Sequence, residues 1–288
     1  MTHPTKAPAL LLSPRIGGGQ AFETVARLCL EHADANEPLV DVHGDHEAVH
    51  QFRVAYRRLR SLFSLAREVS QTDPEAARIK ANLRELTVAF GPARDLDVFR
   101  EGHPDLSEAN ARRLEKARVT AYGDALAFLH SATWQQTRTD LDAWLSEGTY
   151  RDLLGTGTWS GRVWTAGALE RRRKRIRTMG RKLAKLSDHE RHLVRIEAKK
   201  VRYGCQFFGS MWPANAAEVT VMEKQLGALQ DRLGALNDLA TWSRLVKLAR
   251  LKGMEPPSVD VPAELAAAQE TADRIAALPA FWESTLQR

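Results

Sequence analysis

The residues from His50 to Arg60 read HQFRVAYRRLR, and this stretch decides the fold of the chain. On an α-helix, where successive residues turn by 100°, one side of the stretch is cationic over an arc of about 80° and the other is apolar. The cationic side carries His50, Arg53, Arg57 and Arg60, and the apolar side carries Phe52, Ala55, Leu59, Leu62 and Phe63. The pattern predicts an amphipathic helix with a narrow cationic stripe.

The same pattern returns 142 positions later, where the residues from His192 to Arg202 read HLVRIEAKKVR. The second cationic stripe consists of His192, Arg195, Lys199 and Arg202, at the same spacing as the first. A weaker echo aligns GPARDL at 91–96 with GALNDL at 234–239, at an offset of 143. A surface helix needs positive charge, but it does not need the same four positions twice. The repeats therefore indicate an internal duplication, and the alternative is a chance likeness between two amphipathic helices.

The remaining sequence also has helical periodicity, with little alternation and few β-branched runs, so we expect an all-α protein. Helices are expected over 20–36, 45–69, 74–99, 108–147, 163–187, the second copy of the stretch, 216–250 and 264–287, with a break at Gly91–Pro92. We expect a disordered leader over 1–19, a first four-helix half over 20–147, a connecting segment over 148–162 and a second four-helix half over 163–288.

Composition limits the classes of partner. The 288 residues carry a net charge of +6 with a pI near 9.5, which favours an anionic partner such as nucleic acid, a membrane surface or a phosphate polymer. No stretch approaches the roughly 20 apolar residues of a membrane span, and no signal peptide is visible. The two cysteines, Cys29 and Cys205, form no zinc or disulfide pattern. A cytoplasmic protein that does not bind membranes is expected.

Four segments in order resemble the signature segments of the CHAD (conserved histidine α-helical domain) family: 50–60, GPARDLD at 91–97, RIEAKKVRY at 195–203 and LQDRLGALNDL at 229–239. The resemblance implies two four-helix bundles related by pseudo-two-fold symmetry, with a basic groove or pore between them. It also implies binding of inorganic polyphosphate and association with polyphosphate granules. The chain resembles a stand-alone member, without the triphosphate-processing domain to which other members are fused.

The family's signature histidines match His50 and His192, and its signature basic positions match the other members of the two stripes. The second half departs from the first at Asn237, which stands where the first half has Arg94. A cationic role at position 237 is therefore unsupported.

Each stripe is about 15 Å long, a length that suits a linear polyanion better than a single phosphate. Arginine offers a planar fork to phosphate oxygens, and lysine offers a mobile point charge. Other basic residues are expected to line the same groove: Lys80, Arg84 and Arg94 from one face of the helix over 74–99, Arg171, Arg175 and Arg181 from the helix over 163–187, and Lys224. We expect His50 and His192 to donate hydrogen bonds to phosphate oxygens, and the alternative is a structural role for both.

Motifs for catalysis are missing from the sequence. It shows no Ser/His/Asp arrangement, no Walker loop and no paired acidic motif for two metals, so we expect a non-catalytic protein without a cofactor or metal site. Asp95, Asp97 and Asp238 are expected to cap helix ends or to pair with arginines. The competing hypotheses are a nucleic-acid-binding protein, a metal-dependent phosphohydrolase using Asp95, Asp97 and the histidines, and a scaffold whose charges serve solubility.

Overall fold

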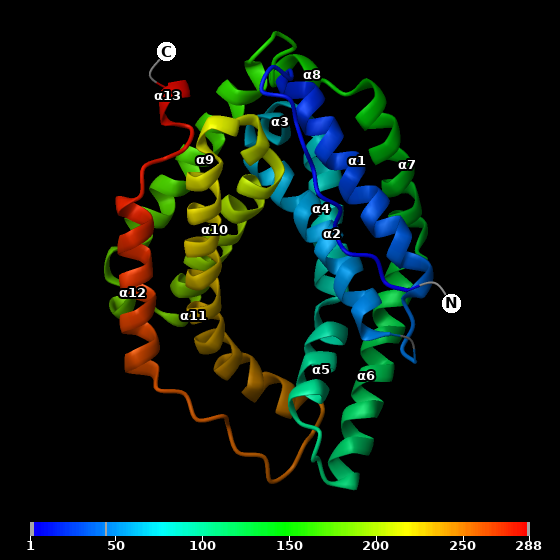
Figure 1. Cartoon of the computed structure of the whole chain (residues 1–288). Helices are drawn as coiled ribbons and strands as arrows, with labels where there is room; N and C mark the ends of the chain where they lie inside the picture. The colour runs from blue at the N-terminus through cyan, green and yellow to red at the C-terminus, as the bar shows by residue number, and fades with distance from the viewer. Residues whose placement is uncertain (1–2, 44, 287–288) are drawn as a thin grey trace.

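The computed structural model describes residues 3–43 and 45–286, and over these residues it contains helices and no β-strand (Figure 1). The prediction of an all-α protein is confirmed. The α-helices are α1 Gly18–Asn36, α2 His46–Leu65, α3 Arg67–Thr72, α4 Pro74–Ala89, α5 Gly91–Gly102, α6 Glu108–Leu129, α7 Ala132–Glu147, α8 Tyr150–Leu153, α9 Ser160–Met179, α10 Asp188–Phe208, α11 Ala216–Leu248, α12 Val261–Ala277 and α13 Glu283–Leu286. Short 3-10 helices are η1 Glu37–Leu39, η2 Gly180–Lys185, η3 Gly209–Met211 and η4 Pro213–Asn215.

The helices gather in two groups. In Figure 1, α1, α2 and α4–α7 lie on one side and α9–α12 lie on the other. α2 packs against α1, α4 and α5, and α10 packs against α9 and α11. The two groups meet where α1 packs against α9 and α2 packs against α10, and again where α5 packs against α11. The two stripe-bearing helices are therefore central and in mutual contact.

Local signals explain where the two stripe helices begin. Asp45 is the N-cap of α2, and its side chain accepts a hydrogen bond from the backbone N–H of Glu47. Ser187 caps α10 in a capping box, because its hydroxyl accepts from the N–H of Glu190 while the Glu190 carboxylate accepts from the N–H of Ser187. The apolar faces of both helices are buried, as the amphipathic pattern predicts.

The echo motifs differ in structure. α4 ends at Ala89 and α5 starts at Gly91 with Pro92 in its first turn, so the predicted break is confirmed. α11 runs unbroken through Gly234 and Ala235, because no proline interrupts its hydrogen-bond ladder.

Four expected helices were wrong in extent. The helix expected over 45–69 ends at Leu65, and after the non-helical Ala66 the chain continues as α3. The helix expected over 108–147 is divided into α6 and α7, because Ser131 caps a new helix with its hydroxyl on the N–H of Trp134. The helix expected over 163–187 ends at Met179 and continues as η2. The last expected helix is shortened to α12 and the short α13, and residues 287 and 288 lie outside the described residues.

The leader is also different from the expectation. Residues 3–17 form an extended strap along the helices instead of a disordered segment, while residues 1 and 2 lie outside the described residues. Thr5 donates its N–H to Asn36 Oδ1 at 2.9 Å, and Leu12 donates its N–H to Ser210 Oγ at 2.9 Å. Gly18 begins α1 and lies close to the backbone of Leu154, since a Cβ there would lie 1.9 Å from the carbonyl oxygen of Leu154. The partners of the strap are distant in sequence, so local composition does not reveal them.

An aromatic and cationic contact joins the two groups at the α2–α10 crossing. The side chain of Arg58 is buried, donates a hydrogen bond to Gln206 Oε1 at 2.8 Å and lies over the ring of Phe207, with 4.7 Å from Cζ to the ring centroid. This contact holds the stripe helices together beside their cationic faces. None of the described helices is long and apolar enough to cross a lipid bilayer.

Candidate functional site

The two cationic stripes converge. α2 and α10 pack against each other, and the charge that acts most strongly on Lys199 of α10 comes from Arg57 of α2. The charge of Arg57 also acts on Arg195, so electrostatic repulsion links the two helix groups at two positions. We call the eight stripe residues together with Lys80 and Arg94 the cationic cluster. The cluster joins positive side chains from both halves of the sequence.

The arginines of the first stripe are held by the end of α4. Arg53 donates from Nη1 to the carbonyl oxygen of Thr87 at 2.9 Å, and Arg60 donates from Nη1 to Thr87 Oγ1. Carbonyl groups in the last turn of a helix carry partial negative charge and favour nearby cations. Both guanidinium groups are thus held by uncharged groups of α4. The carboxylates of Asp95 and Glu85 act electrostatically on Arg53 and Arg60, respectively.

The second stripe is held by α11 in a related way. Arg195 donates from Nε to the carbonyl oxygen of Gln230 at 3.2 Å. A Cβ at Gly234 would lie 3.6 Å from Arg195 Nε, and a Cβ at Gly91 would lie 4.0 Å from Arg53 Nη1. The two glycines occupy equivalent places in the echo motifs, and each lies against the arginine of its own half. The duplication that the sequence indicates therefore has a counterpart in these contacts.

Mutual repulsion and burial destabilise the charges of the cluster. Burial, followed by the charges of Arg57, Arg195, Arg53 and Arg202, lowers the pKa of Lys199 to about 7. Burial and the charge of Arg57 lower the pKa of Arg53 to about 10. The pKa of Lys80 is lowered by burial and by Arg172, Lys200 and Arg60. The cluster would therefore be stabilised by a ligand that carries several negative charges.

The two histidines lie in different surroundings. Burial and the charge of Arg94 lower the pKa of His50. Burial also lowers the pKa of His192, but there a hydrogen bond between Nδ1 and Asn237 Oδ1, 3.0 Å long, opposes the shift. Asn237 thus orients the ring of His192, whereas the ring of His50 has the cation of Arg94 at the equivalent place.

Not every predicted residue joins the cluster. Arg94 acts on His50 of the first stripe. Arg60 acts on Lys80, and the exposed Arg84 acts on Arg60 from the margin of the cluster. Arg171 instead pairs with Glu68 of α3 at 3.2 Å, so its prediction as a lining residue is not supported by its position.

Three further predicted residues lie apart from the stripes. Arg175 is exposed at the edge of the cluster, 3.9 Å from Glu197. Arg181 and Lys224 are exposed, and within the described part of the chain neither forms a hydrogen bond or ion pair with the cluster. The basic run on α9 wraps around the helix, so spacing alone could not select its inward members.

The member of that run that acts on the cluster is Arg172, which sequence reasoning missed. Its Nη1 lies 3.1 Å from the Glu197 carboxylate of α10, and its charge lowers the pKa of Lys80 and of Lys200 after the effect of burial. Glu197 is a buried acid within the second stretch, and it is the only sequence signal that a basic partner is required there.

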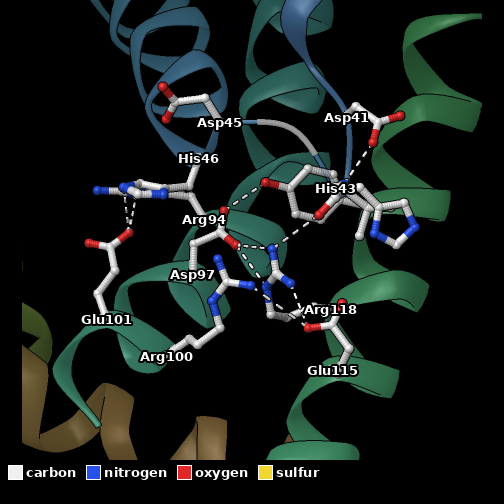
Figure 2. A network of polar contacts seen from close by, with 12 residues as sticks. Asp41, His43, Asp45, His46, Arg94, Asp97, Arg100, Glu101, Glu115 and Arg118 are labelled. Atoms are coloured by element: carbon white, nitrogen blue, oxygen red, sulfur yellow. Dashed lines mark hydrogen bonds and ion pairs between the residues drawn. The ribbon is translucent and has the colours of Figure 1, made fainter. Parts of the chain in front are cut away.

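The acidic residues of the first echo motif pair with arginines, as predicted. Figure 2 shows Asp97 beside Arg118, and the shortest distance between the two charged groups is 2.8 Å. Tyr122 donates its hydroxyl to the other Asp97 oxygen at 2.7 Å. Asp95 pairs with Arg244 of α11. Asp238, the third acid, acts electrostatically on Arg195. Over residues 3–43 and 45–286, no group of three His, Cys, Asp or Glu side chains is arranged to hold a metal ion.

Comparison with known proteins finds a structural relative and sequence relatives. The crystal structure of the CHAD domain from the plant Ricinus communis superposes with a TM-score of 0.73 at 26% identity, covering 99% of this chain and 95% of that one. Two uncharacterized proteins of Mycobacterium tuberculosis, MT2285 and Rv2226, are each 30% identical over 203 residues. That match covers 65% of this chain and 38% of the length of each relative. The family model described as CHAD domain matches residues 24–247, and the chain therefore belongs to the CHAD domain family.

Proposed function

We propose that this chain binds inorganic polyphosphate along the cationic cluster. The observation that carries the proposal is the electrostatic coupling of Arg57 on α2 to Lys199 and Arg195 on α10. The two rows of positive charge are near enough to repel one another across the contact between the helix groups. A long polyanion laid between them would relieve that repulsion over its whole length.

The chemistry of the cluster suits a partner that carries phosphate groups. Arg53, Arg57 and Arg195 offer guanidinium forks, and each phosphate unit of the polymer offers oxygens that accept from such a fork. The Nε of Arg57 is buried and has no hydrogen-bond partner among the described residues. Binding would release counterions from the polymer, and the affinity should fall steeply with salt.

The proposal includes a finer description of the fold. We propose that the two halves are duplicated four-helix bundles related by pseudo-two-fold symmetry, with the cluster in a basic groove between them. The equivalent Gly91–Arg53 and Gly234–Arg195 contacts support this relation. The binding is non-catalytic in this proposal, and the protein would act in the cytoplasm, at polyphosphate granules.

The experiment is a titration with long-chain polyphosphate at two salt concentrations. The variant is Arg53→Ala/Arg195→Ala, and the matched control is Arg112→Ala/Arg274→Ala, which removes two exposed arginines outside the cluster. We expect tight binding by the wild type and the control, and a loss of affinity in the first variant. Its salt dependence should also be shallower, because fewer phosphates are neutralised.

Competition distinguishes polyphosphate from nucleic acid. Polyphosphate should displace a bound single-stranded DNA at low concentration, and DNA should not displace polyphosphate. Equal loss of affinity in both double variants would reject the cluster as the site. Release of phosphate from the polymer, in the presence of magnesium or manganese, would reject a purely binding role.

A further inference from the structure

A cavity of about 540 Å³ lies where the end of α11 meets the first helix group. α11 reaches across from its own group to pack against α5, and its last residues form one wall of the cavity (Figure 1). The other walls come from α6 and from the junction between α4 and α5. The volume lies within the range of binding sites for small molecules. None of the residues of the cationic cluster lines this cavity, so it is separate from the site described above.

One face of α6 presents polar groups to the cavity in a fixed order. Arg113, Lys116, Thr120 and Asp124 follow one another at spacings of three or four residues, so they lie on the same side of the helix. With a rise of 1.5 Å per residue, Asp124 lies about 12 Å beyond Lys116 along the helix axis. The face is therefore cationic at one end and acidic at the other.

The surface between these polar groups is apolar. Ala117 and Ala121 contribute it from α6, and Pro92 and Leu248 contribute it from the neighbouring walls. The two alanine side chains are small, so they leave room for a flat ring.

Arg250, on the wall formed by the end of α11, occupies a backbone position that favours glycine. Its φ is 53°, and its N–H donates to the carbonyl oxygen of Lys247 at 3.2 Å, while the N–H of Leu251 donates to that of Val246 at 2.9 Å. These bonds form a Schellman motif, whose left-handed residue is usually glycine because a Cβ strains that conformation. A strained residue beside a cavity indicates that its side chain has a function there.

Arg250 lies toward the same end of the cavity as Arg113. Asn110, in the first turn of α6, donates from Nδ2 to the carbonyl oxygen of Lys252 at 2.8 Å. Its Oδ1 accepts from Nη1 of Arg113 at 3.1 Å. Because Lys252 follows Arg250 by two residues, their Cα atoms are at most about 7 Å apart. The two arginines therefore add to the positive charge at the start of α6.

Most of the charges around the cavity have no protein partner. Among the described residues, the side chains of Lys116, Asp124 and Arg250 form no hydrogen bond or ion pair. The hydroxyl of Thr120 donates to the carbonyl oxygen of Lys116 at 3.0 Å, and its oxygen can still accept. An apolar surface with a few convergent polar groups is typical of a site for a small ligand.

We propose that this cavity binds a nucleoside diphosphate, with its phosphates at Arg113, Lys116 and Arg250 and its base toward Asp124. Phosphate oxygens accept from guanidinium and ammonium groups, and the three cations match the charge of a diphosphate. The flat base would lie on the apolar surface, and Thr120 would accept from a ribose hydroxyl. The span of about 12 Å from Lys116 to Asp124 suits the distance between the phosphates and the far edge of a base.

Asp124 favours one base over the others. An ionised carboxylate only accepts hydrogen bonds. Guanine presents two adjacent N–H donors on one edge, which fit the two carboxylate oxygens, whereas adenine presents a donor beside an acceptor. The site should therefore prefer guanosine diphosphate (GDP).

Isothermal titration with GDP, without added divalent metal, tests the site. The wild type should bind GDP at a single site, and Lys116→Ala and Arg250→Gly should each weaken binding by about tenfold, since each removes a charged donor. The matched control is Arg112→Ala, whose arginine pairs with Glu108 instead, and it should bind as the wild type does. No binding by the wild type, or unchanged affinity in both site variants, would overturn the proposal.

The variant Arg250→Gly also separates binding from stability. Glycine adopts a positive φ without strain, so the thermal midpoint of the free variant should equal or exceed that of the wild type, although its affinity for GDP falls. A lower midpoint would give Arg250 a structural role and would contradict the argument from strain.

Two further ligands test the recognition of the base. ADP should bind about tenfold more weakly than GDP, because a buried acceptor would face the carboxylate. Asp124→Asn should remove this difference, since an amide both donates and accepts. Equal affinity of the wild type for GDP and ADP would contradict the role of Asp124, and inorganic diphosphate that binds as tightly as GDP would reject a nucleotide site.

A last comparison distinguishes this inference from the proposed function. Arg53→Ala/Arg195→Ala should retain the affinity for GDP while it loses affinity for polyphosphate. Loss of GDP binding in that variant would place the nucleotide in the cationic cluster and overturn this inference. Tight GDP binding by a wild type that does not bind polyphosphate would reject only the proposed function.

Discussion

The two halves of the chain use one sequence pattern in two different settings. In the first half, Pro92 interrupts the helix and Arg94 faces His50. In the second half, α11 is continuous, and Asn237 forms a hydrogen bond with His192. The arginines that follow each histidine are nevertheless held alike, Arg53 by α4 and Arg195 by α11. The comparison teaches that both copies of the pattern bond their first arginine to a backbone carbonyl group, while the helix that supplies this carbonyl differs.

The largest expected effect concerns an acid that only the first half has. Asp97 stands where the second half has Ala240, and it neutralises Arg118, whose side chain is 2% exposed. Asp97→Ala should lower the free energy of unfolding by about 3 kcal/mol, because the buried Arg118 loses one of its two carboxylate partners and keeps only Glu115. Urea denaturation measures the change. Asp97→Ala/Arg118→Met should be less destabilised than the single variant, and an equal loss in both would contradict the ion pair as the cause.

The next effect tests the break that distinguishes the echo motifs. Ala235→Pro places a proline inside α11, where the break of the first half would be, and should cost about 3 kcal/mol or more of unfolding free energy. Pro92→Ala should cost less than about 1 kcal/mol, because a first-turn proline makes no helical hydrogen bond. Denaturation curves of the two variants give the comparison. Similar stability of both would mean that continuity of α11 is unimportant.

A smaller effect is expected when the two cationic stripes are compared as binding surfaces. Arg57 acts on residues of both rows, so Arg57→Ala should weaken polyphosphate binding by about 1–3 kcal/mol. Arg202 lies at the end of the second row, 3.9 Å from Glu223, and Arg202→Ala should weaken it less. Isothermal titration on both variants measures the difference. A larger loss for Arg202→Ala would place the polymer on the second half alone.

The pH dependence of binding follows from Lys199. Its pKa is about 7 in the free protein, and a bound polyanion favours the ammonium form and raises that pKa. Affinity should therefore be highest below pH 7 and fall as pH rises, by up to about tenfold per pH unit between the free and bound pKa values. Lys199→Arg, which keeps its charge, should remove this decline between pH 7.5 and 9. A decline that persists in the arginine variant would assign it to another group.

The smallest effect is a change in the pKa values of the two histidines when the residues beside them are exchanged. Arg94→Asn removes a cation and should raise the pKa of His50, while Asn237→Arg should lower the pKa of His192. NMR titration of the imidazole protons measures both shifts. No shift in either variant would mean that burial alone sets the two pKa values.

Much of this fold follows from the sequence, because its signals are local. The cationic spacing defines α2 and α10, Asp45 caps α2, and Gly91–Pro92 separates α4 from α5. Contacts between distant residues are less predictable. Arg172 was missed because Glu197, its partner, lies 25 residues away on another helix, and the strap is held by side chains such as Ser210. Lys199 was predicted as a cation, but its lowered pKa depends on how α2 and α10 cross.

The strap has a practical consequence for anyone who shortens the protein. The family match starts at residue 24, yet Leu12 is buried and the side chain of Asn36 forms hydrogen bonds with both backbone groups of Thr5. Trimming to the matched boundary would remove the hydrogen-bond partner of the Asn36 amide at the end of α1. It would also remove Leu12, the buried apolar residue beside Ser210. Such a fragment would be prone to precipitate during expression, although every residue of the two stripes is retained.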